Sequence, residues 1–140
     1  MERLTVLVVG MTNKVGGLEN FVLQYCRRMT AENVRFDFLS RFPDCVYADR
    51  IAQMGGKLYT VTRRSRNPFR FYREIRAFFA AHGREYDVVW DNETMMNDMT
   101  PLRLAAKAGV PVRIYHSHNA ANMDPSLKGR AQELLHRFFG

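Results

Sequence analysis

The sequence predicts an α/β fold, namely a Rossmann-like, doubly wound parallel sheet of about five strands with helices on both faces. Short runs rich in β-branched and aromatic residues alternate with segments whose apolar residues recur at helical spacing. The first run, LTVLVVG at 4–10, is almost continuously apolar, as expected for a central strand covered on both faces. No repeat or low-complexity linker interrupts the alternation, so we expect one domain.

Five strand–helix units follow one another along the chain. Strands are expected at 4–10, 34–40, 57–62, 86–91 and 112–117, and helices at 18–29, 47–54, 67–82, 99–108 and 126–139. Gly55-Gly56 and Gly109 end the second and fourth helices, and Pro68 suits the first turn of the third.

The helix at 18–29 has the clearest amphipathic pattern. We expect one face to pack on the sheet and the other to meet solvent. The expected inner residues are Leu18, Phe21, Val22, Tyr25, Cys26 and Met29, and the expected outer residues are Glu19, Asn20, Gln24, Arg27 and Arg28.

Charge and cysteine content restrict the class of protein. Among 140 residues, 21 are Lys or Arg and 14 are Asp or Glu, a formal net charge of +7. Most basic residues are arginine, which binds phosphate with two hydrogen bonds, so partners that carry phosphate are favoured. Cys26 and Cys45 are too few for a disulfide framework or a four-ligand zinc site.

Two further classes of protein lose support from the sequence. No apolar run approaches the roughly 20 residues that span a bilayer, and no signal peptide is evident, so we expect a cytoplasmic protein. No helix-turn-helix, zinc-finger or RNA-binding signature accompanies the positive charge, so nucleic acid is not an expected partner.

Ligands of such a sheet bind at the carboxyl ends of its strands, and the loop after the first strand contains two glycines. Gly16 and Gly17 lack a Cβ, so backbone can approach a ligand, and the N–H groups of the following helix face an incoming anion. The loop matches neither the dinucleotide-binding fingerprint nor a Walker loop. A plain flexible connection is the alternative.

Histidines follow the fifth strand in the segment YHSHN at 115–119. His116 and His118 are two residues apart and therefore share a face of an extended chain. They would contact substrate or metal, but spacing places no third metal ligand, so metal is the weaker hypothesis. His118 lies nearer the strand exit and is the better functional candidate, with a structural role as the alternative for either histidine.

Acidic and amide side chains close the fourth strand. Asp91, Asn92 and Glu93 are expected at the rim of the crevice, where they would orient a sugar hydroxyl or act as a base. Ordinary loop solvation is the alternative.

The segment 63–76 is rich in arginine, with six Arg and one Glu. Its outer arc resembles a membrane-surface patch, and a solvated charged face is the alternative. On a helical wheel the inner arc holds Phe71, Tyr72, Ile75, Phe78 and Phe79, and the outer arc holds Arg70, Arg73 and Arg76 with Phe69.

Two motifs in order resemble one known family. VLVVG at 6–10 leading to GGLENF at 16–21, with GVPVRIYHSHN at 109–119, resembles the N-terminal domain of family 4 glycosyltransferases of the GT-B fold. The similarity is greatest to the branch that builds capsular and extracellular polysaccharides. In that family two Rossmann-like domains face each other, and the N-terminal domain mostly receives the acceptor while the C-terminal domain binds the nucleotide-sugar donor.

The resemblance implies a domain assignment and a reaction. Residues 1–140 would form a truncated acceptor-side domain without the donor-binding domain, so this chain alone is expected to be inactive. The whole enzyme would transfer a sugar to a saccharide or lipid-linked acceptor, with retained configuration and with no cofactor or obligatory metal.

The resemblance also implies roles for individual residues. His118 would act in catalysis near the transferred sugar, and Arg66, Arg70 and Arg73 would contact phosphate or the inner face of an anionic membrane. The substrate-binding residues would be Gly16, Gly17, Glu19, His116 and Asn119. Asp91 and Asn92 are substrate-binding candidates from their place at the end of the fourth strand and not from the resemblance.

A stand-alone flavodoxin-like or nucleotide-binding module is the alternative class. The loop at 12–17 only poorly approximates a flavodoxin phosphate loop, and bound flavin would favour this class. A receiver domain fails, because it needs acidic residues after the first strand and an Asp that ends the third.

Overall fold

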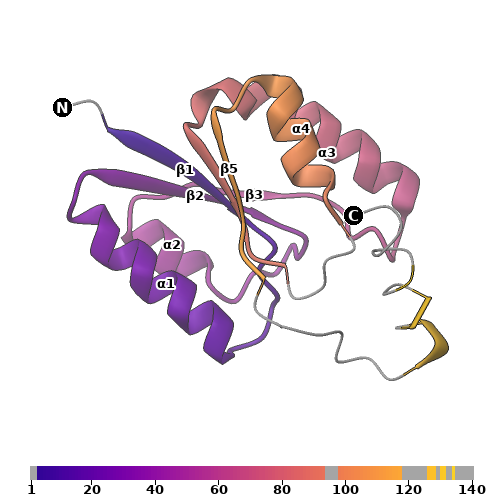
Figure 1. The fold of residues 1–140 in the computed structure, drawn as a ribbon. Coiled ribbons are helices and arrows are strands. Elements are labelled where there is room, and N and C mark those ends of the chain that lie inside the picture. Colours follow the sequence, from indigo (N-terminus) through magenta and orange to yellow (C-terminus); the bar gives the residue numbers. More distant parts are fainter. Residues whose placement is uncertain (1–2, 94–97, 118–125, 129, 132–133, 135–140) are drawn as a thin grey trace.

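The computed structural model describes residues 3–93, 98–117, 126–128, 130–131 and 134. Its described part contains one parallel sheet in the order β3-β2-β1-β4-β5, which confirms the predicted fold class (Figure 1). The order reverses between β1 and β4, so the topological switch point lies there. The strands are β1 (Leu4–Val9), β2 (Val34–Ser40), β3 (Leu58–Thr60), β4 (Val88–Asp91) and β5 (Val112–Tyr115).

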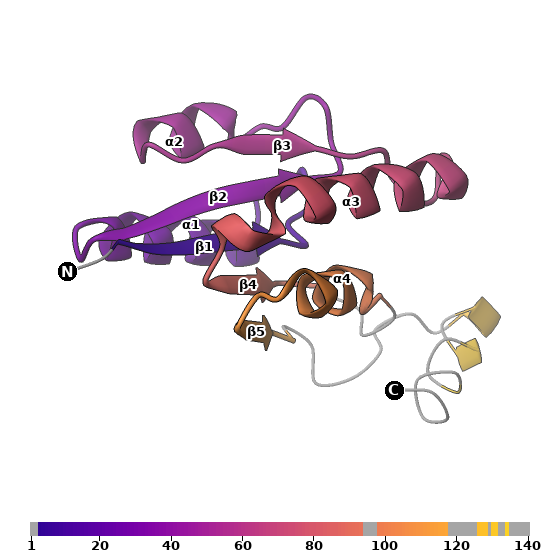
Figure 2. The same ribbon diagram turned by 90° about the horizontal axis from the view of Figure 1, so that it is seen from above.

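Helices cover both faces of the sheet. As Figures 1 and 2 show, α1 and α2 pack on one face, and α3 and α4 pack on the other. The helices are α1 (Gly17–Thr30), α2 (Ala48–Gln53), α3 (Pro68–His82) and α4 (Thr100–Ala108), with a short 3₁₀ helix η1 (Gly83–Glu85).

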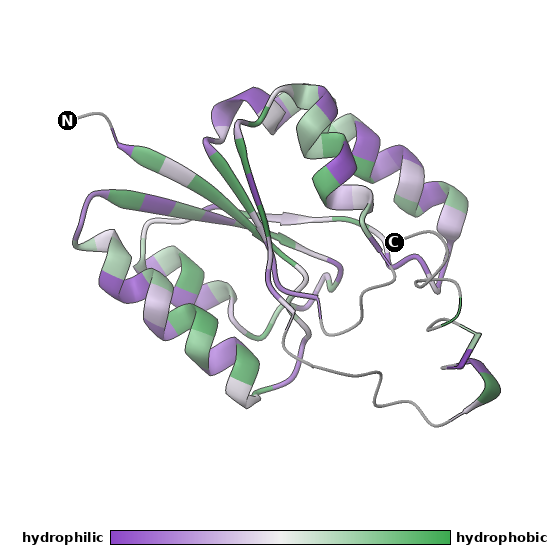
Figure 3. Cartoon of the chain, in the orientation of Figure 1, coloured by the Kyte–Doolittle hydropathy of each residue, from purple (hydrophilic) through white to green (hydrophobic). Residues whose placement is uncertain are grey.

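The strand β1 lies at the centre and contributes to both cores. Val6 and Val8 pack with Val22 of α1, whereas Leu7 and Val9 pack with the α3 and α4 residues. Alternate residues of a strand point to opposite faces, so a continuously apolar strand fills both layers. Figure 3 shows largely apolar strands between helices in which hydrophilic and hydrophobic residues alternate.

The expected last helix falls partly outside the described residues. The described residues 127, 128, 130, 131 and 134 are helical, and the Arg130 N–H donates to the Ser126 carbonyl over 3.0 Å. The strands β3, β4 and β5 are shorter than expected, spanning Leu58–Thr60, Val88–Asp91 and Val112–Tyr115.

Two predicted helix faces need correction. In α1, Glu19 is buried, while Phe21 and Tyr25 are 51% and 45% exposed. The buried stripe is Glu19, Val22, Leu23 and Cys26, because the Glu19 carboxylate is held by the preceding loop. In α3, Tyr72 is exposed and rests edge-on against the buried ring of Phe71, with 5.1 Å between ring centroids.

Candidate functional site at the carboxyl edge of the sheet

The ends of β1 and β4 meet at the switch point. Val9 pairs with Asp91, and Gly10 then turns away with a φ of +87°. A Cβ on Gly10 would lie 2.7 Å from Asp91 Oδ1 and 2.9 Å from the Glu93 backbone nitrogen. Only glycine allows this approach, so Gly10 fixes how closely the ends of β1 and β4 meet.

The loop after β1 is tied down by hydrogen bonds from several elements. The Thr12 N–H and hydroxyl donate to Glu19 Oε1 over 3.2 and 2.5 Å, and the Tyr47 hydroxyl donates to the Lys14 carbonyl. The Asn13 amide donates to the Asp44 carbonyl over 3.0 Å, and its oxygen accepts from the Val46 N–H over 2.9 Å. These bonds argue against a plain flexible connection, and they place the Glu19 side chain inside the loop.

The two loop glycines have different surroundings. A Cβ on Gly16 would lie 2.9 Å from Glu19 Oε2, whereas a Cβ on Gly17 would meet nothing within 4 Å. Among the described residues, no side chain caps α1 at Gly16. The first N–H groups of α1 therefore lack a side-chain acceptor at an open surface, where an anion would be stabilised by the helix dipole.

His116 is anchored at the same edge. Its N–H donates to the Asp91 carbonyl over 2.8 Å, and its Nδ1 lies 3.2 Å from Asn92 Oδ1. Its ring stacks on Trp90, with centroids 6.0 Å apart and planes at 15°, and Phe21 approaches edge-on at 6.1 Å. The predicted residues His118 and Asn119 lie outside the described residues.

Asp91 and Asn92 are fully buried at the end of β4, so loop solvation is the wrong interpretation of these two residues. Within the described part of the chain, neither Asp91 carboxylate oxygen accepts a hydrogen bond. Burial, followed by the negative charge of Glu93, raises the pKa of Asp91 to about 8. The raised pKa favours the protonated form of Asp91, in which the carboxyl group can donate a hydrogen bond.

An ion network that sequence reasoning missed joins the strand ends. Arg41, directly after β2, contacts Glu93 over 2.8 Å and Asp98 over 3.2 Å, and Arg64 lies 3.5 Å from Asp98. Asp98 is almost fully buried. The position of Arg41 directly after a predicted strand could have indicated this network, because the carboxyl ends of neighbouring parallel strands meet at one edge.

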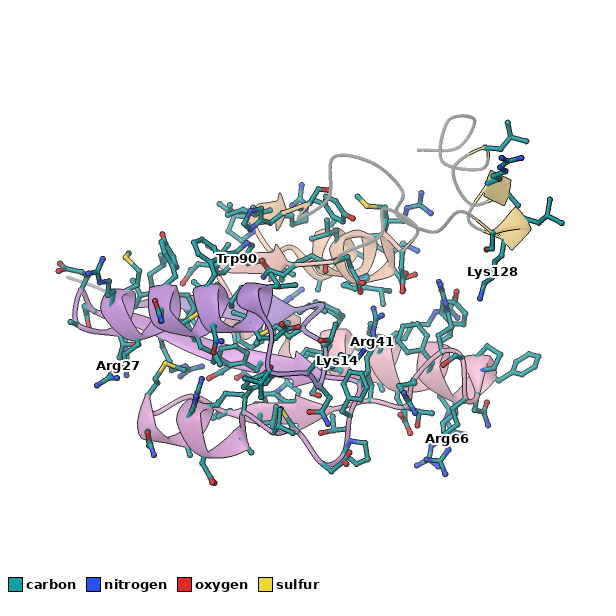
Figure 4. All side chains as sticks on the ribbon, turned by 90° about the horizontal axis from the view of Figure 1, so that it is seen from below. Lys14, Arg27, Arg41, Arg66, Trp90 and Lys128 are labelled. Atoms are coloured by element: carbon teal, nitrogen blue, oxygen red, sulfur yellow. The ribbon has the colours of Figure 1, made fainter. Side chains whose placement is uncertain are left out.

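The predicted arginines separate into two groups. Arg66 and Arg70 line a cleft of about 510 Å³ beyond β2 and β3, whereas Arg73 is exposed on α3 and is not part of the lining. Arg70 Nε contacts Glu74 Oε1 over 2.6 Å. Figure 4 shows Arg41 near the middle of this edge and Arg66 farther out beside α3.

Two kinds of feature are absent from the described residues. They contain no group of three or more His, Cys, Asp or Glu side chains able to hold a metal ion. No helix among them is long and apolar enough to cross a membrane.

A doubly wound parallel sheet with helices on both faces defines a Rossmann-like domain. Residues 15–140 match the model of Glycosyltransferase Family 4. The chain is also 34% identical over 123 residues to "Putative glycosyltransferase EpsF" of Bacillus subtilis (strain 168). This chain belongs to glycosyltransferase family 4, which confirms the resemblance. The match covers 86% of this chain and 31% of the Bacillus protein.

Proposed function

We propose that this chain forms the acceptor-side domain of a glycosyltransferase of polysaccharide biosynthesis. The enzyme would transfer a sugar from a nucleotide-sugar donor to a saccharide or lipid-linked acceptor, and a second domain would complete a GT-B fold and bind the donor. The observation that carries the proposal is the family match over residues 15–140, whose matched part includes the open glycine loop at the switch point.

The loop and the start of α1 would bind an anionic part of a substrate. Gly17 leaves the surface open, and the uncapped N–H groups of α1 point toward it. An anion at a helix N-terminus gains up to about 2 kcal/mol in favourable geometry. Glu19 would support this subsite indirectly, because it holds Thr12 and therefore the loop.

The histidine segment would contact the sugars. Asn92 and Trp90 fix the ring of His116, which makes it a preorganised contact for an acceptor hydroxyl. His118 and Asn119 would extend this contact surface, with His118 nearest the transferred sugar. Asp91 would keep the strand end neutral at physiological pH, because burial raises its pKa to about 8.

Catalysis would rest on positioning and on stabilising the departing diphosphate. Oriented N–H groups stabilise a developing negative charge without reorganising, and correct orientation of the acceptor hydroxyl lowers the entropic part of the barrier. We propose retention of the anomeric configuration, without a cofactor or an obligatory metal. The proposed location is cytoplasmic, at the inner face of the membrane, with Arg66, Arg70 and Arg73 toward the anionic surface.

The proposal is tested by assaying the complete gene product. Radiolabelled UDP- and GDP-sugars are mixed with saccharide and lipid-diphosphate acceptors, and label is expected in the acceptor for at least one pair. Gly17→Val serves as the matched variant, because its added atoms occupy open space in the protein but would obstruct a ligand at the loop. Transfer should therefore fall while folding persists. Failure of every pair, together with flavin absorbance in the purified protein, would support the flavodoxin-like alternative.

A further inference from the structure

A cleft lies apart from the switch point, beyond the carboxyl ends of β2 and β3. Its volume is about 510 Å³, within the usual range for small-ligand sites. The turn at its edge is fixed, because the Arg66 and Asn67 N–H groups both donate to the Arg63 carbonyl, over 3.0 and 3.1 Å. The lining includes Arg41, Arg63, Arg66 and Arg70 as its cations and Asp44 and Glu74 as its anions.

The four cations of the lining differ in how their charge is balanced. Arg41 is paired with Glu93 and Asp98, and Arg70 is paired with Glu74. Hydrogen bonds from Arg70 and the Thr62 N–H lower the pKa of Glu74 to about 2, so its charge persists at neutral pH. Arg70 is therefore neutralised within the cleft.

Arg63 and Arg66 form no ion pair with any described residue. The Arg63 guanidinium lies over the Phe42 ring, 5.2 Å from its centroid, so its plane is oriented by stacking. Stacking leaves the guanidinium N–H groups available, and a guanidinium fork matches the oxygens of a phosphate. The cleft thus presents two unneutralised guanidiniums from one fixed turn.

We propose that this cleft binds the diphosphate group of a substrate through Arg63 and Arg66, an inference that rests on the proposed function. Two free guanidiniums suit the two phosphoryl groups of a diphosphate better than one carboxylate or neutral hydroxyls. The anion subsite that we propose at Gly17 and this cleft lie beyond different strands of the same edge. We therefore assign the diphosphate in this cleft to the acceptor, because the proposed second domain binds the donor.

Binding is measured by calorimetry with inorganic pyrophosphate and with farnesyl diphosphate as probes. The test variant is Arg63→Ala/Arg66→Ala, and the matched control is Arg76→Ala/Arg103→Ala, which removes the same charge from exposed positions of α3 and α4 outside the lining. The test variant should lose at least about tenfold in affinity for both probes, the loss of one charge-assisted contact or more. The control variant should change by less than about twofold.

The two probes distinguish the source of the diphosphate. Tighter binding of farnesyl diphosphate than of pyrophosphate supports a lipid-linked group, and equal binding supports a free or water-soluble diphosphate. Equal losses of affinity in both double variants would overturn the assignment of this cleft as the diphosphate site. The same holds if the protein binds phosphatidylglycerol vesicles but neither diphosphate probe. The complete protein could lack transferase activity and still bind diphosphate in a way that depends on Arg63 and Arg66. That result would refute the proposed function but support the cleft as a diphosphate site.

Discussion

At the scale of single residues, substitution by alanine adds the same methyl group at Gly10, which is crowded, and at Gly17, which is open. Gly10→Ala places a methyl group 2.7 Å from Asp91 Oδ1 at a φ of +87°, so both contact and backbone are strained. We expect a loss of about 2 kcal/mol in the free energy of unfolding, measured by urea denaturation. Gly17→Ala, in open space, should change stability by less than about 1 kcal/mol, and equal losses would contradict this geometry.

Asp91 gives a prediction about pH. Folding raises its pKa from 3.8 to about 8, so the folded protein binds more protons than the unfolded chain between these values. The free energy of unfolding should therefore fall as pH rises through this window. The Asn side chain of Asp91→Asn cannot ionise, so the free energy of unfolding of this variant should depend less on pH. At pH 8 the variant should be more stable than wild type by about 2 kcal/mol or more.

Denaturation at a series of pH values measures the effect of Asp91. The exposed Asp44 provides the control, because Asp44→Asn makes the same chemical change in water. The control should keep the pH dependence of the wild type. An unchanged slope in Asp91→Asn would mean that other groups produce the dependence.

His118 tests the proposed catalytic assignment in the complete enzyme. If His118 contacts the reacting sugar, His118→Ala should lower kcat by about 100-fold or more and leave the donor Kd nearly unchanged. Steady-state kinetics and donor titration measure the two quantities separately. Near-normal turnover would make His118 structural.

Sequence reasoning placed the described candidate residues at the strand ends and loops where they lie but missed their environments. The strand-end rule located Asp91 and Asn92, yet both are buried rather than at an exposed rim. Glu19 was placed on the outer face of its helix because charge usually marks the solvent side. Its burial follows from bonds to Thr12, which lies seven residues away across a loop that periodicity does not describe.

At the scale of elements, α3 presents basic residues next to an exposed aromatic ring. Phe69 is 89% exposed at the start of the helix, whereas Phe71 and Ile75 are fully buried. The inner arc was thus predicted correctly except for Tyr72. A ring in water beside arginines is typical of surfaces that contact anionic bilayers.

We therefore expect the protein to co-sediment with phosphatidylglycerol vesicles at low salt. Each basic residue near such a surface contributes about 1 kcal/mol, and raising the salt to about 1 M shortens the Debye length to about 3 Å. Arg66→Glu/Arg70→Glu/Arg73→Glu should abolish most binding. The control Arg27→Glu/Arg28→Glu/Arg103→Glu makes the same charge change at exposed positions of α1 and α4, and equal losses would make α3 an ordinary solvated helix.

At the scale of the whole molecule, the class of the sheet follows from rules that the sequence already satisfies. Alternating strands and helices with right-handed crossovers predict a doubly wound sheet. The switch point between β1 and β4 was not predicted from the residues, because it depends on which face each helix covers. The cleft at Arg63 and Arg66 was also missed, since it forms only when β2, β3 and the start of α3 come together.

The final prediction concerns activity of residues 1–140 by themselves. The match covers 31% of the Bacillus relative, and the described candidate residues lie along one edge of a single sheet. A nucleotide sugar held on one side only would keep its anomeric carbon exposed to water and poorly oriented toward an acceptor hydroxyl. We expect residues 1–140 to fold and to bind pyrophosphate, yet to consume no UDP- or GDP-sugar with or without acceptor. Circular dichroism verifies folding in the same sample, and detectable turnover would refute the two-domain arrangement that we propose.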